Sequence, residues 1–156
     1  MIRLYDMKKT PNNFYLILEY CNGGDLDAYV KKRKYLTEEE AIEMMCQLIH
    51  GFEHLYKHKI LHRDLKLANI LLNDGVVKIA DFGFSKILGE EELAATMLGS
   101  PLNMAPEVLQ NQEYSNKADI YSLGVCYYWM LYGKYPFCYL GLHSMPAMWS
   151  NSKESS

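Results

Sequence analysis

The stretch "HRDLKLAN", residues 62–69, places a carboxylate, an amine and an amide close together in the chain. A second carboxylate follows in the triplet "DFG" at residues 81–83. The first stretch carries too many charges for a buried helix, and the apolar residues around it argue against a solvated tail. We therefore interpret it as a polar loop that is held between buried elements and carries out chemistry.

The composition indicates about one globular domain. The chain has 156 residues, of which 49% are hydrophobic and 22% are charged. The net charge of -3 gives no general affinity for nucleic acid. We expect no membrane segment, since no apolar run approaches the roughly 20 residues that cross a bilayer, and the N-terminus is too polar for a signal peptide. The cysteines lack metal-type spacing and resemble free thiols, so we predict a cytoplasmic protein.

Secondary-structure signals place this loop between a helix and a hairpin. Residues 2–6 and 14–20 read as two strands joined by a turn, and a short helix is predicted near residues 26–32. Thr37 and Glu40 form a capping box that starts a longer helix. Apolar residues then recur at helical spacing and predict one buried face. They are Ile42, Met45, Ile49 and Phe52, with Ala41, Leu48 and Leu55 widening the stripe.

The second half of the chain alternates between a hairpin, a long loop and a helix. "NDG" at residues 73–75 lies between two apolar runs and predicts a β-hairpin. Residues 84–104 have no clear period and read as a long loop, and residues 114–133 read as a second buried helix. Beyond Phe137 the pattern fades, so we predict a divergent, disordered tail at residues 138–156.

The residues alone favour phosphate chemistry with a metal ion. The oxygens of Asn69 and Asp81, together with a phosphate, are the hard ligands that Mg²⁺ prefers. Asp64 can accept a proton from an incoming hydroxyl, and Lys66 can balance charge on a moving phosphoryl group. Gly83 allows a sharp turn beside Asp81. Taken one at a time, these side chains are also compatible with ordinary loop positions.

Their order along the chain resembles the protein kinase signature. D-x-K-x-x-N at residues 64–69, "DFG" at 81–83 and "APE" at 105–107 follow one another as they do in that superfamily. The resemblance covers roughly residues 2–137. Residues 93–109, "LAATMLGSPLNMAPEVL", are most similar to the autophagy-initiating ULK kinases, with calcium/calmodulin-type and polo- or aurora-like kinases as alternatives.

The resemblance implies an α+β, protein-kinase-like fold that is truncated. Residues 1–20 would supply the end of the N-lobe sheet, with two strands and the start of the hinge. Residues 21–137 would supply the mainly helical first part of the C-lobe. We expect the family's further N-lobe and C-lobe elements to be missing from this chain.

The resemblance also implies a serine/threonine kinase that uses ATP and Mg²⁺. Asp64 would be the catalytic base that orients the substrate hydroxyl, and Lys66 would partner the γ-phosphate. Asn69 and Asp81 would bind the metal. The lysine in the "LKxxN" pattern indicates serine/threonine rather than tyrosine specificity, and "GSP" at residues 99–101 resembles a substrate-docking loop.

The stretch "LEYCNGGDL", residues 18–26, resembles the hinge that binds the nucleotide. The backbone of Glu19 and Cys21 would bond the adenine, and Leu18 would be the gatekeeper. Asp25 would reach the ribose, and Leu71 would pack under the adenine ring.

Further residues resemble the structural core of the family's active state. His62 and Phe82 resemble members of a hydrophobic stack, with Leu4 as a third, and Gly83 completes the DFG triplet. Asp119 resembles the buried aspartate that holds the catalytic loop from the second long helix. Glu107 is the glutamate that normally pairs with a later arginine.

Regulation by phosphorylation is implied by the arginine before the catalytic aspartate. Arg63 would pair with a phosphate on the loop that follows DFG, and Lys86 is placed to help. Thr96 is the best candidate for that phosphorylation site, because a phosphothreonine would form charge-assisted hydrogen bonds and order the loop. The alternative is an unmodified loop threonine.

The chain also departs from the family pattern. It contains no G-x-G-x-x-G and no V-A-I-K-like lysine, and nothing after Phe137 resembles the family's later helices. Asn103 stands where an aromatic residue is common. Because half of the phosphate clamp is absent, we expect little or no activity from the chain alone.

Three interpretations remain open. The first is an active kinase seen in part, with a protein substrate, ATP and regulatory or scaffold partners. The second is a short non-catalytic module that binds a partner protein, and the third is a non-functional remnant. A separate metal site at His50, His54 and His58 is compatible with their spacing, but no Cys or acidic residue clusters with them, which favours a solvated helix face.

Overall fold

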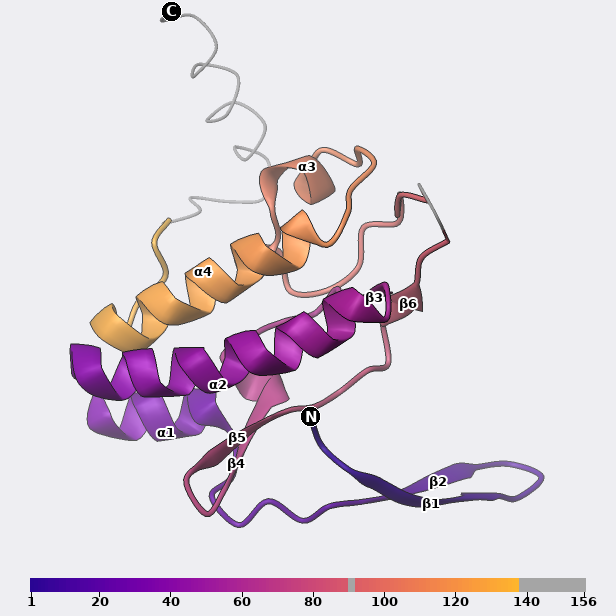
Figure 1. Ribbon diagram of the computed structural model, residues 1–156, viewed down its shortest axis with the longest axis horizontal. Coiled ribbons are helices and arrows are strands. Elements are labelled where there is room, and N and C mark those ends of the chain that lie inside the picture. The colour runs from indigo at the N-terminus through magenta and orange to yellow at the C-terminus, as the bar shows by residue number, and fades with distance from the viewer. Residues whose placement is uncertain (90–91, 138–156) are drawn as a thin grey trace, which may run out of the picture.

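The computed structural model describes residues 1–89 and 92–137, which form a helical body and a projecting ribbon (Figure 1). Helices α1 (Leu26–Arg33), α2 (Glu38–Lys57) and α4 (Lys117–Tyr132) make up most of the body, and α3 (Pro106–Leu109) is a single short turn. Strands β1 (Leu4–Lys9) and β2 (Phe14–Leu18) form the ribbon, which extends away from the helices (Figure 1). The predicted tail at residues 138–156 lies outside the described residues.

Helix α2 begins with the predicted capping box. The Glu40 N–H donates to Thr37 Oγ1 at 3.3 Å, and the Thr37 N–H donates to Glu40 Oε2 at 3.0 Å. Its buried face contacts β5, β3 and α4. The fully buried members of that face are Ala41, Leu48, Phe52 and Leu55.

The predicted buried face of α2 was wrong in part. Ile42 and Ile49 are 45% and 50% exposed, although their spacing placed them with the core residues. The apolar stripe is wider than the surface that its neighbours cover, so the packing of β5 and α4 selects only the side through Leu48. Periodicity alone could not show which edge of the stripe would stay uncovered.

Helix α4 is apolar around most of its circumference, as expected for a buried helix. It begins three residues later than predicted, because Tyr114 instead forms an isolated β-bridge with Ala94. The helix ends at Gly133, whose φ of 60° is left-handed. A Cβ at this position would lie 2.0 Å from the Lys34 carbonyl oxygen, so only glycine fits.

Three antiparallel strand pairs connect the helices. Strands β4 (Ile70–Asn73) and β5 (Val76–Ile79) form the predicted hairpin around Asp74 and Gly75. Strands β3 (Ile60–Leu61) and β6 (Lys86–Ile87) pair beside the end of α2, so the loop predicted at residues 84–104 contains a short strand. It also contains a one-turn 3₁₀ helix at Pro101–Asn103. In the ribbon, β1 runs later and β2 ends earlier than predicted.

No helix in the described part of the chain is both long enough and apolar enough to cross a membrane.

Candidate active site

The loop at residues 62–69 lies between β3 and a one-turn 3₁₀ helix at Leu67–Asn69. Asp119 of α4 holds this loop from below the surface. The His62 N–H donates to Asp119 Oδ2 at 2.7 Å, and the Arg63 N–H donates to Asp119 Oδ1 at 3.0 Å. Burial raises the pKa of Asp119, although the two backbone donors act in the opposite direction. Asp119 therefore occupies the position that its resemblance to the family's loop-holding aspartate implied.

Asp64 lies at the centre of a polar cluster and is only 4% exposed. Lys66 Nζ lies 2.9 Å from Asp64 Oδ2, and Asn69 Nδ2 donates to the same oxygen at 2.9 Å. Ser100 Oγ donates to the other oxygen, Oδ1, at 2.9 Å. Burial by itself would raise the pKa of Asp64, but the hydrogen bonds from Lys66, Ser100 and Asn69 outweigh it and hold the pKa below its usual range. The carboxylate is thus an ionised acceptor near neutral pH.

Ser100 is a site residue that the sequence did not single out. Lys66 Nζ also donates to Ser100 Oγ at 2.9 Å, so the hydroxyl bridges the lysine and Asp64. Gly99 lets the chain approach this closely: its φ is 109°, and a Cβ there would lie 2.2 Å from the Arg63 carbonyl oxygen. The only signal in the sequence was the "GSP" motif, which indicated a docking loop and not a contact with Asp64.

The two predicted metal ligands lie at the two ends of the β4–β5 hairpin. Asn69 precedes β4 and is 7% exposed; its amide nitrogen is engaged by Asp64, which leaves its side-chain oxygen for a cation. Asp81 follows β5 with a φ of 58°, and its Oδ1 accepts the Gly83 N–H at 3.3 Å. The Ala80 N–H donates to the Asn69 carbonyl at 2.9 Å and so ties these ends together.

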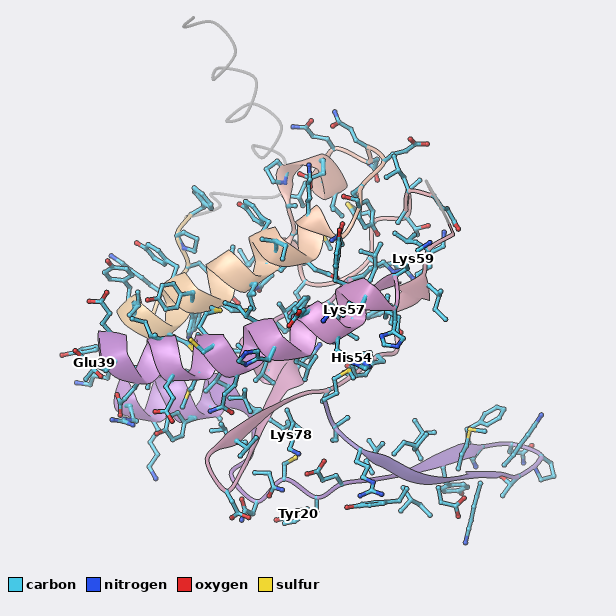
Figure 2. All side chains as sticks on the ribbon, viewed as in Figure 1. Tyr20, Glu39, His54, Lys57, Lys59 and Lys78 are labelled. Atoms are coloured by element: carbon cyan, nitrogen blue, oxygen red, sulfur yellow. The ribbon has the colours of Figure 1, made fainter. Side chains whose placement is uncertain are left out.

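The donor set fits Mg²⁺ and not a softer metal. Both side chains offer hard oxygen atoms, and Mg²⁺ typically takes few protein ligands plus phosphate oxygens. No group of three or more His, Cys, Asp or Glu gathers around a cation-sized space within residues 1–89 and 92–137. In particular, the His54 and His58 rings approach each other at 4.2 Å on the exposed side of α2 (His54 is labelled in Figure 2), but they form no such group.

His62 and Phe82 make the predicted contact. The His62 ring is fully buried, its Nε2 is hydrogen-bonded to the Ala80 carbonyl at 2.9 Å, and its centroid lies 5.1 Å from that of Phe82. Phe82 in turn lines a largely apolar cavity of about 540 Å³ together with Leu4 and Leu18 of the ribbon. The expected gatekeeper and the DFG triplet therefore share one cavity.

The predicted hinge joins the ribbon to the body. The Glu19 carboxylate accepts from Lys78 Nζ at 2.9 Å, from the Arg3 N–H at 3.1 Å and from Asn73 at 3.2 Å. The contact with Lys78 is the largest reason why the pKa of Glu19 is lowered. Lys78 of β5 and Tyr20 lie on the same side of the molecule, where ribbon and body meet (Figure 2).

Asp25 has a structural role in addition to the predicted ribose contact. Its Oδ1 accepts the Ala28 N–H at 2.8 Å and caps α1. Asp25 also forms a β-bridge with Leu71, which places the expected ribose and adenine contacts next to each other. Cys21 is half-buried between them and Glu19 in sequence.

The predicted regulatory residues do not meet. Arg63 Nε donates to the Phe84 carbonyl at 2.5 Å, and Lys86 Nζ pairs with Glu92 at 2.5 Å. Thr96 is exposed, and its contact is a backbone one, from Tyr114 Oη at 2.7 Å. Glu107 makes no ion pair with any residue in the described ranges, 1–89 and 92–137. A phosphate on Thr96 would have to displace Glu92 to reach Lys86.

Comparison with known proteins agrees with this geometry. The model of the protein kinase domain matches residues 1–151, so the chain belongs to the protein kinase family. The truncated kinase-like α+β fold is thereby confirmed. The match extends beyond residue 137, and the predicted boundary there stays a prediction.

Its relatives include serine/threonine kinases of the ATG1 and ULK type. The serine/threonine-protein kinase ATG1c of Arabidopsis thaliana is 47% identical over 141 residues, 88% of this chain and 19% of the relative. Serine/threonine-protein kinase atg1 of Dictyostelium discoideum is 44% identical, over 86% of this chain and 21% of the relative. Serine/threonine-protein kinase ULK1 of Homo sapiens is 42% identical, over 88% of this chain and 14% of the relative. The chain thus spans about a fifth or less of the length of these relatives.

Proposed function

We propose that this chain carries the catalytic and metal-binding half of an ATP-dependent serine/threonine protein kinase of the ULK type. The observation that carries the proposal is the buried Asp64 carboxylate, with Lys66, Ser100 and Asn69 each 2.9 Å from one of its oxygens. A carboxylate held ionised in this way is suited to orient a substrate hydroxyl and to accept its proton.

In this reaction the side chains mainly position and neutralise charge. Asp64 receives the hydroxyl of a protein serine or threonine, and Lys66 stabilises the negative charge that develops on the transferred phosphoryl group. ATP supplies that phosphoryl group, and Mg²⁺ neutralises the phosphates. The fixed Ser100 hydroxyl keeps Lys66 beside Asp64, since it bonds to both.

Nucleotide and metal would be bound by the residues on either side of the hairpin β4–β5. Asn69 and Asp81 would hold Mg²⁺ through their side-chain oxygens. The backbone of Glu19 and Cys21 would bind the adenine, Asp25 would contact the ribose through the oxygen that does not cap α1, and Leu71 would form the floor. Leu18 would limit access to the cavity beside Phe82.

We further propose regulation through Thr96, whose exposure would allow modification. A phosphate there would compete with Glu92 for Lys86 and would attract Arg63. Thr96→Ala in the full-length protein should then lower phosphotransfer, whereas Glu92→Ala should make the wild-type protein less dependent on phosphorylation. Unchanged activity in Thr96→Ala would refute this part of the proposal.

The cellular role would follow that of the relatives. We propose a cytoplasmic kinase that acts on protein substrates in the initiation of autophagy, together with regulatory or scaffold proteins. The 156 residues lack a G-x-G-x-x-G and a strand lysine, so the chain by itself should have little or no activity.

The deciding experiment is Asp64→Asn in the full-length protein, with phosphorylation of a serine peptide as the readout. Removal of the proton acceptor should lower turnover by about 10²- to 10⁴-fold. Glu113→Gln, an exposed change remote from the site, serves as the control. If Asp64→Asn keeps full turnover, the proposal fails.

The second candidate is a non-catalytic module that binds a partner, and the exposed apolar ribbon favours it. In that case Asp64→Asn would leave cellular function intact, and substitutions in the ribbon would abolish it. The two proposals therefore predict opposite outcomes for the same pair of variants.

A further inference from the structure

A second, smaller cavity lies beside the catalytic loop and has not been used above. Its volume is about 170 Å³, and it lies between α1, the loop and α4. The side chains that matter here are Asp27, Lys66, Asn103, Cys126, Trp129 and Tyr135. Lys66 connects the two places, because its ammonium group lies 2.9 Å from Asp64. A peptide whose hydroxyl is held at Asp64 can therefore reach this cavity with a neighbouring side chain.

Two buried polar atoms of this cavity's lining residues have no hydrogen-bond partner in the described part of the chain. They are Oδ1 of Asn103, a residue only 4% exposed, and Nε1 of Trp129. Leaving such an atom unsatisfied costs about 1–3 kcal/mol, so a partner is expected. One atom is an acceptor and the other is a donor.

The two side chains are held in place by their surroundings. Asn103 Nδ2 donates to Cys126 Sγ at 3.6 Å, and the Asn103 carbonyl accepts from Ser122 Oγ at 2.7 Å. The Trp129 ring packs edge-on against Tyr135, with centroids 4.1 Å apart. The unpaired oxygen and N–H are thus fixed features of the cavity and not freely rotating surface groups.

The charged groups of the cavity are already matched. Asp27 pairs with Lys31 at 2.6 Å, and Lys66 pairs with Asp64. Burial raises the pKa of the Cys126 thiol to about 12, so this group is neutral near pH 7. Without excess charge, the cavity should prefer a neutral polar ligand.

We propose that this cavity is a substrate subsite that takes the primary amide of a glutamine or asparagine near the phosphorylated serine or threonine. The amide NH₂ donates to Asn103 Oδ1, and the amide oxygen accepts from Trp129 Nε1. A primary amide offers both groups on one carbon, which matches one unpaired acceptor and one unpaired donor. This inference rests on the proposed kinase function, because Asp64 and Lys66 define where the peptide lies.

The volume supports a side chain over a single water molecule. A water molecule has about 30 Å³ of liquid volume, well below that of this cavity. Water bridging nevertheless gives a different experimental outcome, because a water-filled cavity would show no preference among peptides.

The test measures peptide binding, which does not require phosphotransfer. Fluorescence anisotropy with the full-length protein compares serine peptides that carry Gln, Asn, Leu or Glu at each position around the serine. We expect one position at which the amide peptide binds about fivefold more tightly than the Leu peptide, the size of one or two net hydrogen bonds. Equal binding of all peptides at every position would overturn the inference.

Two variants assign the preference to this cavity. Trp129→Phe removes the N–H but keeps an aromatic ring, and Asn103→Leu removes the acceptor at similar volume. Each should abolish the preference for the amide, whereas Tyr128→Phe, a neighbour on α4 that does not line this cavity, should retain it. A preference that survives both cavity variants would refute the assignment.

The outcomes separate this inference from the proposed function. Phosphotransfer without an amide preference would refute only the subsite. An amide preference in a protein that does not phosphorylate the bound peptide would refute only the kinase activity.

Discussion

The helical body and the β1–β2 ribbon treat their apolar side chains in opposite ways. In the body, Leu26, Leu48 and Leu55 are 0%, 0% and 1% exposed. In the ribbon, Phe14 and Leu16 are 65% and 57% exposed, although both strands have the composition of core strands. The residues around Asp64 belong to the body, so the candidate catalytic centre is supported by a packed core while the cavity beside Phe82 is roofed by an uncovered ribbon.

The ribbon nevertheless has a defined apolar face. Residues opposite each other on an antiparallel pair share a face. The cross-strand pairs on this face are Leu4 with Leu18, Met7 with Leu16, and Lys9 with Phe14. Leu4, Leu16 and Leu18 line the cavity that Phe82 also lines. A two-stranded ribbon is marginally stable at best by itself, so its order depends on this contact with the body.

The comparison is tested most strongly by matched leucine truncations. Leu48→Ala should lower the free energy of unfolding by about 2–5 kcal/mol, because it leaves a cavity in the core. Leu16→Ala, the same chemical change in the ribbon, should lower it by about 0.5 kcal/mol or less, because the side chain is already in water. Urea denaturation of both variants measures the difference. Similar losses would show that the ribbon is buried in solution.

The support of the catalytic loop by α4 is tested by Asp119→Ala. The change leaves the buried N–H groups of His62 and Arg63 without an acceptor, which should destabilise the protein by about 2–4 kcal/mol. Asp119→Asn keeps one acceptor and should lose less. Hydrogen exchange of the His62 and Arg63 amides reports the effect directly. Unaltered protection of these amides in Asp119→Ala would contradict the anchoring role.

The close approach of the "GSP" segment to the catalytic loop is tested by Gly99→Ala. A Cβ would lie 2.2 Å from the Arg63 carbonyl at a left-handed φ, so we expect a loss of about 1–3 kcal/mol or displacement of Ser100 from Asp64. Gly124→Ala is the matched control, since a Cβ there meets no atom within 4 Å and alanine favours a helix. Circular dichroism melting of the two variants should therefore shift in opposite directions.

The sequence was most informative where local chemistry determines structure. The capping box at Thr37, the hairpin at Asp74 and the motif residues Asp64 and Asp119 were all predictable, because each depends on near neighbours or on an ordered motif. Ser100 was not, since its contact with Asp64 joins residues 36 apart in the chain.

Exposure was also difficult to predict. Ile42 and Ile49 share the helical period of the buried residues, and Phe14 and Leu16 read as core strand residues. A pattern records which side chains can be buried, whereas burial depends on the element that covers them. Similarly, the chain order did not reveal that Glu92 pairs with Lys86, since that contact depends on how the loop folds back.

The smallest expected effect concerns acid stability and separates the two carboxylates that fix the loop. The pKa of Asp64 lies below its ordinary value of 3.8, so the unfolded state binds the proton first as the pH falls. The stability that Asp64 contributes is therefore present above pH 3.8 and is lost below it. The pKa of Asp119 is raised above 3.8, so the folded state retains its proton longer, and stability falls as the pH rises through that raised pKa.

Asp64→Asn and Asp119→Asn should consequently change opposite limbs of the pH profile. Urea midpoints measured from about pH 2.5 to 7 should show that Asp64→Asn loses the decline below pH 3.8, while Asp119→Asn loses the decline above it. Each change is small because one proton is involved and other carboxylates titrate in the same range. If both variants changed the same limb, the two carboxylates would share one environment, which would contradict the distinction between a hydrogen-bonded Asp64 and an Asp119 dominated by burial.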